Sequence, residues 1–178
     1  MVDWNIIATA QPGRDRDLLQ ELNQLGDFRR PGFRGILIGR VADVNQFLEA
    51  VRQAAEQGMK WVEALARVLP VEQIFRFTPE TFEAELKAAV APFIERMVAG
   101  TFYVRLERRG FKGRIISPEV ERTLDTYVIG LAAEHGKTLQ VSFEDADYVI
   151  VAETISDMCG VAMLTRELRA RYPFVKIR

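Results

Sequence analysis

A strict alternation of apolar and polar side chains marks residues 101–109, which read TFYVRLERR. The apolar positions are Phe102, Val104 and Leu106. The alternate positions are partly cationic: Tyr103, Arg105, Glu107 and Arg109. Because successive side chains of a strand point to opposite faces, this pattern predicts a strand with one buried face and one half-exposed, cationic face.

The segment before this strand carries the signals of a helix. Thr78 is suited to cap it and Pro79 to occupy its first position, where the missing N–H costs nothing. The apolar spacing continues to Met97. Pro92 falls inside this segment, and we expect it to kink the helix because proline removes a backbone donor.

After the strand, Ser117 and Pro118 open a second helix, which we expect to end at Gly136. Two apolar runs follow, at 148–155 and 160–164. Their length and the short polar connection between them predict an antiparallel hairpin buried on both faces. The second half of the chain is therefore expected to run helix, strand, helix, strand, strand, and to end in a basic tail.

The first 75 residues predict a βαββαβ unit. The expected strands are 5–10, 28–30, 36–41 and 61–71, and the expected helices cover 18–25 and 43–55. Asp43 and Gln46 have the spacing of a capping box, and Gly26 is expected to stop the first helix in a left-handed conformation. We therefore expect a mixed α/β (α+β) chain, with a ferredoxin-like domain over residues 1–75 and a second α/β domain over 76–178.

The composition is that of a soluble globular protein: 48% of the 178 residues are hydrophobic and 28% are charged. These proportions exclude a disordered, collagen-like or coiled-coil chain. The sequence contains neither a signal-peptide pattern nor an apolar run long enough to span a membrane, so we expect a cytoplasmic protein. The single cysteine, Cys159, excludes an internal disulfide and a cysteine-built zinc site.

The net charge of −1 hides a strong segregation of charge along the second half. Residues 101–116 contain five basic and one acidic side chain, and residues 158–178 contain the same numbers. Between them, residues 117–157 contain nine acidic and two basic side chains. Because a polyanion responds to the local field rather than to the total charge, near-neutrality does not exclude a nucleic-acid partner.

The first basic stretch holds the candidate RNA-binding residues: Arg105, Arg108, Arg109, Lys112 and Arg114. Arginine suits this task because its planar guanidinium binds phosphate in bidentate fashion and stacks on unpaired bases. The helix that opens at Ser117 adds backbone amides as a further anion site. In the alternative interpretation, Arg105 and Arg109 belong to a surface ladder of ion pairs with Glu107 and the acidic helix 119–125.

These candidates also provide a test: replacing Arg105, Arg108 and Arg109 together by Glu is expected to abolish RNA binding without changing the melting temperature.

Signals for catalysis are weak. His135 is the only histidine and is expected to cap the C-terminal end of a helix. Cys159 has no neighbouring base, and Asp145 and Asp147 resemble a solvated acidic turn more than a metal site. The phosphate-binding motifs GxxxxGK and GxGxxG are absent. We therefore expect no catalytic residue, no metal and no cofactor.

Four pieces of the second half together resemble a THUMP domain. They are FYVRLERRG at 102–110, the helix that begins at Ser117, DYVIV at 147–151 and GVAML at 160–164. RVLPV at 67–71 is similar to the segment that joins a THUMP domain to a preceding ferredoxin-like domain. The resemblance covers nearly the whole chain.

The resemblance implies an RNA-binding module of a tRNA-modifying system. THUMP domains are fused to 4-thiouridine synthetases, methyltransferases or pseudouridine synthases, and the residues up to Arg178 leave no room for such a domain. The resemblance therefore implies a non-enzymatic adaptor, similar to the stand-alone members that bring tRNA to a cytidine acetyltransferase. Its expected partners are tRNA, through the acceptor stem and its single-stranded end, and a separate modifying enzyme.

Two alternatives remain at this point. The chain could be a protein-interaction subunit that keeps the THUMP fold without binding RNA, or a small-molecule enzyme. The salt dependence of binding distinguishes the protein-interaction subunit from an RNA-binding protein. Added salt steeply weakens binding to a polyanion and hardly affects an apolar contact. A small-molecule enzyme requires titratable groups that converge in a pocket.

Overall fold

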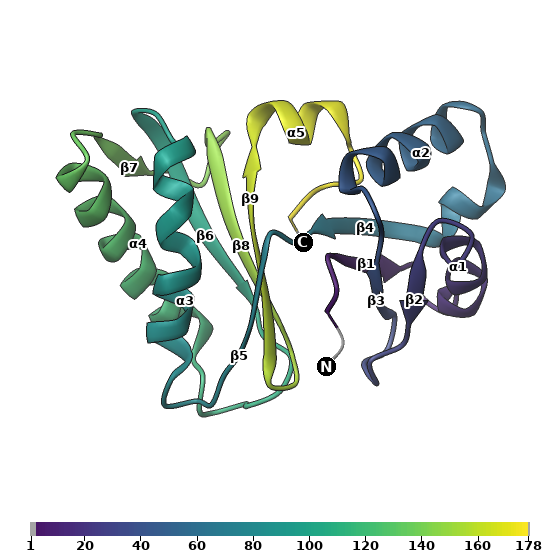
Figure 1. Cartoon of the computed structure of the whole chain (residues 1–178), viewed down its shortest axis with the longest axis horizontal. Helices are drawn as coiled ribbons and strands as arrows, with labels where there is room; N and C mark the ends of the chain where they lie inside the picture. Colours follow the sequence, from purple (N-terminus) through teal and green to yellow (C-terminus); the bar gives the residue numbers. More distant parts are fainter. Residues whose placement is uncertain (1–2, 178) are drawn as a thin grey trace. The chain divides into compact units, whose positions relative to one another are not determined.

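The computed structural model describes residues 3–177 and has the mixed α/β fold expected from the sequence, with two sheets and five α-helices in this range (Figure 1). The chain forms two compact units. Unit 1 comprises residues up to Val71 together with 168–176, and unit 2 comprises Glu72–Glu167 together with Ile177. A division into separate domains at residue 75 stays a prediction.

Unit 1 has the predicted βαββαβ order. Its elements are β1 (Ile6–Ala10), α1 (Asp15–Leu22), β2 (Asp27–Arg29), β3 (Ile36–Arg40), α2 (Val44–Glu56) and β4 (Leu65–Pro70). The strands form one antiparallel sheet in the order β2-β3-β1-β4. The capping signal of α2 is confirmed, since the Asp43 carboxylate accepts a hydrogen bond from the Gln46 N–H at 3.0 Å.

Gly26 has a different role from the one expected. It does not adopt a left-handed conformation, and α1 ends at Leu22 with Asn23 as its C-cap. A Cβ atom at Gly26 would lie 2.6 Å from the Arg40 carbonyl oxygen. Glycine is therefore required here because the turn passes close to the end of β3.

The predicted strand at 61–71 is only partly correct. Residues Lys60–Ala64 form a 3₁₀ helix, η1, and the strand begins at Leu65. The alternation of small apolar residues before Leu65 therefore did not distinguish a strand from a tight helical turn. RVLPV at 67–71, expected to join the two halves, lies mostly within β4.

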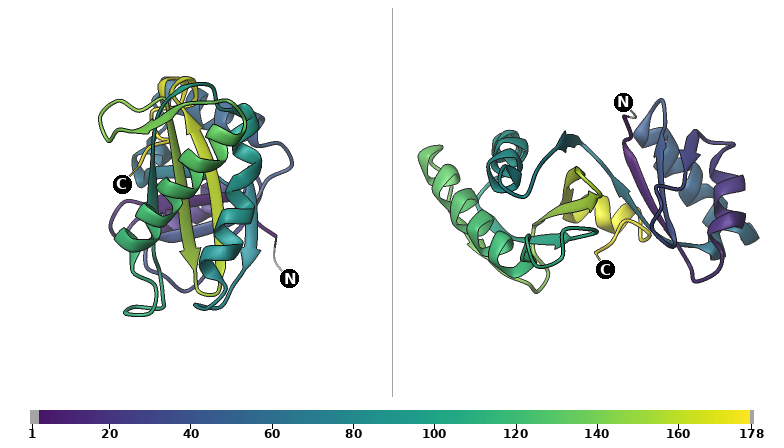
Figure 2. Two further views of the ribbon diagram at one scale, coloured as in Figure 1. Left: turned by 90° about the vertical axis from the view of Figure 1, so that its left-hand side faces the viewer. Right: turned by 90° about the horizontal axis from the view of Figure 1, so that it is seen from below.

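Unit 2 is built on a five-stranded sheet in the order β5-β9-β8-β6-β7. Its elements are β5 (Gln73–Arg76), α3 (Phe82–Val90), η2 (Ala91–Arg96), β6 (Gly100–Glu107), α4 (Ser117–Glu134), β7 (Leu139–Val141), β8 (Tyr148–Ile155) and β9 (Met158–Thr165). β6 runs parallel to β7 and β8, whereas β9 is antiparallel to β8 and β5. α3 and α4 cover one face of this sheet, where the apolar side chains of β6 are buried (Figures 1 and 2).

The buried β8–β9 hairpin and the helix that begins at Ser117 are confirmed. The helix expected from Pro79 starts three residues later, at Phe82, and changes to the 3₁₀ helix η2 where Pro92 interrupts it. β5 and β7 were not predicted because three- or four-residue strands are too short to show an alternation.

The C-terminal stretch, expected to be a basic tail, contains a short helix. α5 (Arg166–Arg171) leads the chain from unit 2 back to unit 1. There the Val68 N–H donates a hydrogen bond to the Phe174 carbonyl at 2.9 Å. Arg178, counted in this stretch, lies outside the described residues.

Among residues 3–177, no helix combines the length and the hydropathy needed to cross a membrane.

Candidate nucleic-acid interface

The predicted alternation of β6 is observed. Phe102, Val104 and Leu106 are buried, whereas Tyr103 and Arg105 are partly exposed. The strand ends at Glu107, so Arg108 and Arg109 belong to the loop of residues 108–116 that leads into α4. We call the exposed side chains of β6 and this loop the cationic surface; its basic members are Arg105, Arg108, Lys112 and Arg114.

Arg109 is an anchor of the loop and not an outward-facing strand residue. Its guanidinium donates to the Glu153 carboxylate at 2.7 Å, with side chains 11% and 0% exposed. Its backbone N–H donates to the Thr154 hydroxyl at 2.7 Å, and that hydroxyl donates back to the Arg109 carbonyl at 3.1 Å. Arg109 therefore fastens the loop to β8.

The ion pair of Arg109 differs from the expected surface ladder, because Glu153 comes from the neighbouring strand rather than from Glu107 or α4. A Glu at position 109 would place a second carboxylate next to the buried carboxylate of Glu153. Charge reversal at Arg105, Arg108 and Arg109 together is therefore expected to destabilise the fold, contrary to the expectation from the sequence.

Arg105 and Lys112 keep their charge uncompensated. Arg105 places its guanidinium carbon 5.8 Å from the centroid of the Tyr103 ring. Neither its guanidinium nor the Lys112 ammonium forms an ion pair with another described residue. Arg108 donates a hydrogen bond to the Gly110 carbonyl, which leaves its positive charge in place.

The loop that carries Lys112 and Arg114 is a compact turn. Gly110 and Gly113 have φ values of 97° and 81°, which glycine adopts without strain. Phe111 also has a positive φ of 52°, and its ring lies 5.5 Å from that of Phe77 between ring centroids. The Phe111 carbonyl accepts hydrogen bonds from the Arg114 and Ile115 N–H groups. The loop is therefore held in place by its own aromatic side chain.

The helix opening at Ser117 offers fewer amides to an anion than expected. Pro118 has no N–H, and the N–H groups of Glu119 and Val120 both donate to the Ile116 carbonyl. The Ser117 side chain makes no capping hydrogen bond. Ser117 therefore contributes little more than its own N–H to an anion site.

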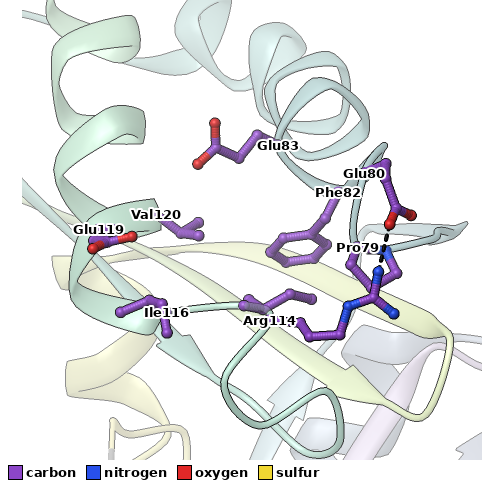
Figure 3. A pocket seen from close by; sticks show the side chains of 9 residues that line it. Pro79, Glu80, Phe82, Glu83, Arg114, Ile116, Glu119 and Val120 are labelled. Atoms are coloured by element: carbon purple, nitrogen blue, oxygen red, sulfur yellow. Dashed lines mark hydrogen bonds and ion pairs between the residues drawn. The ribbon is translucent and has the colours of Figure 1, made fainter.

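An acidic groove of about 180 Å³ borders the cationic surface at Arg114 (Figure 3). The carboxylates of Glu80, Glu83 and Glu119 surround an apolar floor that includes Phe82. Glu80 pairs with Arg114. Hydrogen bonds from its own backbone N–H and from Thr78, together with nearby Arg114, lower the pKa of Glu80. The groove therefore repels phosphate and marks one limit of the cationic surface.

The residues considered for catalysis have structural roles. His135 is the C-cap of α4 as predicted, with its Nδ1 atom 2.9 Å from the Leu131 carbonyl oxygen. Cys159 is fully buried, and burial raises the pKa of its thiol. Asp145 and Asp147 form ion pairs with Arg166. Within residues 3–177, no group of three or more His, Cys, Asp or Glu side chains is arranged to hold a metal.

A carboxylate pair on α4 faces the open edge of β6. Glu121 accepts a hydrogen bond from the Leu106 N–H at 2.9 Å. Burial, and to a lesser extent the charge of Glu121, raise the pKa of Asp125 to about 6. β6 has β7 as a partner only at Gly100–Phe102, so Glu121 satisfies a backbone donor that no strand reaches.

Phe143 was overlooked in the sequence. It follows the short strand β7, and its ring centroid lies 5.5 Å from that of Tyr103. The local signal was a large aromatic residue within a short, mostly acidic segment, SFEDAD.

No protein-family model and no curated protein matches this sequence. Solved structures do match its fold. TrmN from Thermus thermophilus is 21% identical, with a TM-score of 0.63 over 92% of this chain and 46% of its own. PH1313 from Pyrococcus horikoshii is 12% identical, with a TM-score of 0.60 over 90% of this chain and 54% of its own.

A 4-thiouridine synthetase, solved in complex with RNA and ATP, is 14% identical and has a TM-score of 0.53 over 90% of this chain and 41% of its own. At such identities these likenesses demonstrate the fold alone. The chain spans about half the length of the proteins that it matches. Each likeness covers at least 90% of this chain and agrees with the mixed α/β fold expected from the sequence.

Proposed function

We propose that the chain binds RNA through the cationic surface of unit 2. The observation that carries this proposal is that Arg105, Arg108 and Lys112 lie on one strand and its following loop, without an ion pair to any other described residue. Such charges are available to phosphates, which supply most of the affinity in nucleic-acid binding. Arg114 is a fourth contact once phosphate competes with Glu80.

Arg109 and Ser117 have lesser roles in this proposal. Arg109 is a positioning residue, because its pairing with Glu153 holds the loop that presents Arg108 and Lys112. Ser117 offers a single backbone N–H at the end of the loop. Neither group is required to contact RNA.

The RNA is proposed to be tRNA, bound at the acceptor stem and its single-stranded end and presented to a separate modifying enzyme. The resemblance to THUMP domains supports this role, as does the fold shared with a 4-thiouridine synthetase solved with RNA. In this proposal the described residues bind and orient RNA, and the chemistry takes place elsewhere. The identity of the enzyme, a cytidine acetyltransferase by resemblance, is part of the same proposal.

The test is a charge reversal that spares the Arg109 anchor. We expect R105E/R108E/K112E to abolish the retention of bulk tRNA in a filter-binding assay and to leave the unfolding midpoint unchanged. For the unaltered chain, four phosphate contacts to single-stranded RNA predict a slope of log K against log salt of about −3.

The matched control is R16E/K60E/R122E, which makes the same change in total charge at exposed positions that do not belong to the cationic surface. Its binding is expected to stay close to that of the unaltered chain. Full binding by R105E/R108E/K112E, or equal losses in both triple variants, would contradict the proposed interface.

A further inference from the structure

Phe143 is the most exposed large apolar side chain among the described residues, at 68%. Leaving a Phe in water forgoes roughly 1.5–3 kcal/mol of burial free energy. Single exposed apolar residues are common, so exposure alone carries no function. The position of Phe143 relative to two other side chains is more informative.

The backbone holds Phe143 beside β6. β7 is only three residues long, and after it the Ser142 N–H donates a hydrogen bond to the Phe102 carbonyl at 3.0 Å. The Ser142 hydroxyl then donates to the Glu144 carbonyl at 3.1 Å, which closes a turn. As a result the Phe143 ring reaches Tyr103, with ring centroids 5.5 Å apart and planes inclined by 43°.

Arg105 continues this row on the same side of β6. Its guanidinium carbon lies 5.8 Å from the Tyr103 centroid. Its Nε atom is buried without a hydrogen-bond partner among the described residues. Arg108 directly follows β6 and lies five positions after Tyr103, or roughly 17 Å at the usual rise of a strand. Two aromatic rings, one arginine and the loop cations therefore follow one another along the strand.

We propose that Phe143 and Tyr103 form a stacking platform for unpaired RNA bases, with Arg105 holding the adjoining phosphate. This inference rests on the proposed function and locates the single-stranded part of the RNA at the β6–β7 end of the cationic surface. Aromatic rings suit this role because every base has a face that stacks, so binding tolerates different sequences.

The surrounding charges specify which part of the RNA each group contacts. Glu144 is exposed directly after Phe143, so a phosphate is disfavoured there while a neutral base is not. Arg105 and the loop cations lie towards the other end of β6, where phosphates are favoured. The platform therefore binds bases at one end and the backbone continues towards Arg108 and Lys112.

The test compares two RNAs of the same sequence: a 12-nucleotide single strand that carries 2-aminopurine, and its blunt duplex. Stacking on a protein aromatic ring quenches 2-aminopurine fluorescence. We expect F143A to bind the single strand about tenfold more weakly, to lose the quenching and to keep the salt slope, because the phosphate contacts remain. Binding of the duplex, which has no unstacked base, is expected to be unchanged.

Three further variants make the assignment specific. F143W is expected to bind like the unaltered chain, and F143L, which keeps apolar area without a π face, is expected to bind as weakly as F143A. V98A truncates another exposed apolar side chain, 66% exposed, and is expected to have no effect.

The outcomes separate the platform from the proposed function. If the unaltered chain binds neither RNA, the proposed function fails and the platform fails with it. If it binds both RNAs and F143A binds and quenches equally well, the platform alone is wrong. A salt-insensitive dimer in analytical ultracentrifugation that F143A dissociates would also overturn the platform, because Phe143 would then serve protein association.

Discussion

Two stretches of this chain contain the same numbers of basic and acidic side chains, but they differ in which of their cations form ion pairs. Residues 101–116 and residues 158–178 each contain five basic side chains and one acidic one. In the second stretch, Arg166 pairs with Asp145 and Asp147, and Arg171 pairs with Glu49. In the first stretch, Arg105, Arg108 and Lys112 have no such partner among the described residues.

The comparison teaches that net charge counted along a segment does not measure the positive field around it. The carboxylates that pair with Arg166 and Arg171 lie 19, 21 and 122 residues away in the sequence. These arginines hold α5 and the residues after it in place. In the first stretch, Arg109 and Arg114 are paired with carboxylates. The charges of its three other cations remain available to a polyanion.

The largest effect is expected when the more buried of the two ion pairs in the first stretch, that of Arg109 with Glu153, is removed. R109A leaves the Glu153 carboxylate buried without this partner, so we expect the free energy of unfolding to fall by about 3 kcal/mol. Urea unfolding followed by circular dichroism measures it. R108A, at a half-exposed neighbour, is the control and should lie within about 0.5 kcal/mol of the unaltered chain. A loss below about 1 kcal/mol for R109A would contradict its role as an anchor.

The second prediction concerns residues 158–178, the second basic stretch, and removes the carboxylate that pairs with Arg171. Hydrogen bonds from Tyr172 and then from Arg52 and Arg171 lower the pKa of Glu49 from 4.5 to about 2. Because this pKa is depressed in the folded state, its stabilisation is complete above pH 4.5 and disappears as the pH falls towards 2. E49Q is therefore expected to unfold at a lower temperature than the unaltered chain at pH 7, with the difference shrinking below pH 4.5.

Limited proteolysis at pH 7 is expected to cut E49Q faster after Arg171, since the segment that follows loses its contact with α2. E56Q, which removes only an exposed partner of Arg52, is the control. Equal cleavage of both variants would indicate that backbone contacts alone hold the segment.

The third prediction concerns the acidic residues between the two basic stretches. Burial raises the pKa of Asp125 from 3.8 to about 6. Because the pKa of this carboxyl is higher in the folded state, its ionisation lowers the free energy of unfolding. The destabilisation is complete above pH 6 and absent below pH 3.8. We expect D125N to be more stable than the unaltered chain by about 1 kcal/mol at pH 7, after discounting for partial exposure.

Thermal unfolding at pH 7 and at pH 3.5 tests this prediction, since the advantage of D125N should vanish at the lower pH. D27N, at an exposed position on β2, should show no difference at either pH. An advantage that persists at pH 3.5 would assign the effect to packing rather than to charge.

The smallest effect is expected at Arg114. Among the basic members of the cationic surface, it is the one that pairs with an acidic side chain of the described residues. E80Q removes the charge that pairs with it, and we expect tRNA binding to tighten about twofold, because exposed ion pairs are weak. Fluorescence anisotropy at low salt measures the change, and E83Q, on the same groove without an ion pair to Arg114, is the control. Weaker binding by E80Q would mean that Glu80 positions Arg114 instead of competing with RNA.

Much of the fold was predictable because its signals are local. Three such signals are found in the structure: the alternation as far as Glu107, the capping pair at Asp43 and Gln46, and Gly136 after α4. Each depends on neighbours in the sequence. β5, β7 and the partner of Arg109 were not predictable in this way. Each depends on a strand or side chain that the chain brings close only when the sheet forms.

The sequence by itself determined the two-sheet α/β fold and the position of the basic strand, because hydrophobic periodicity and turn residues act over a few positions. Only the tertiary structure decided which cations remain available and which are neutralised. It also brought Phe143 beside Tyr103. The physical reason is that ion pairs and ring contacts depend on distance in space. The paired charges of the second stretch that are compared above lie 19 to 122 residues apart in the sequence.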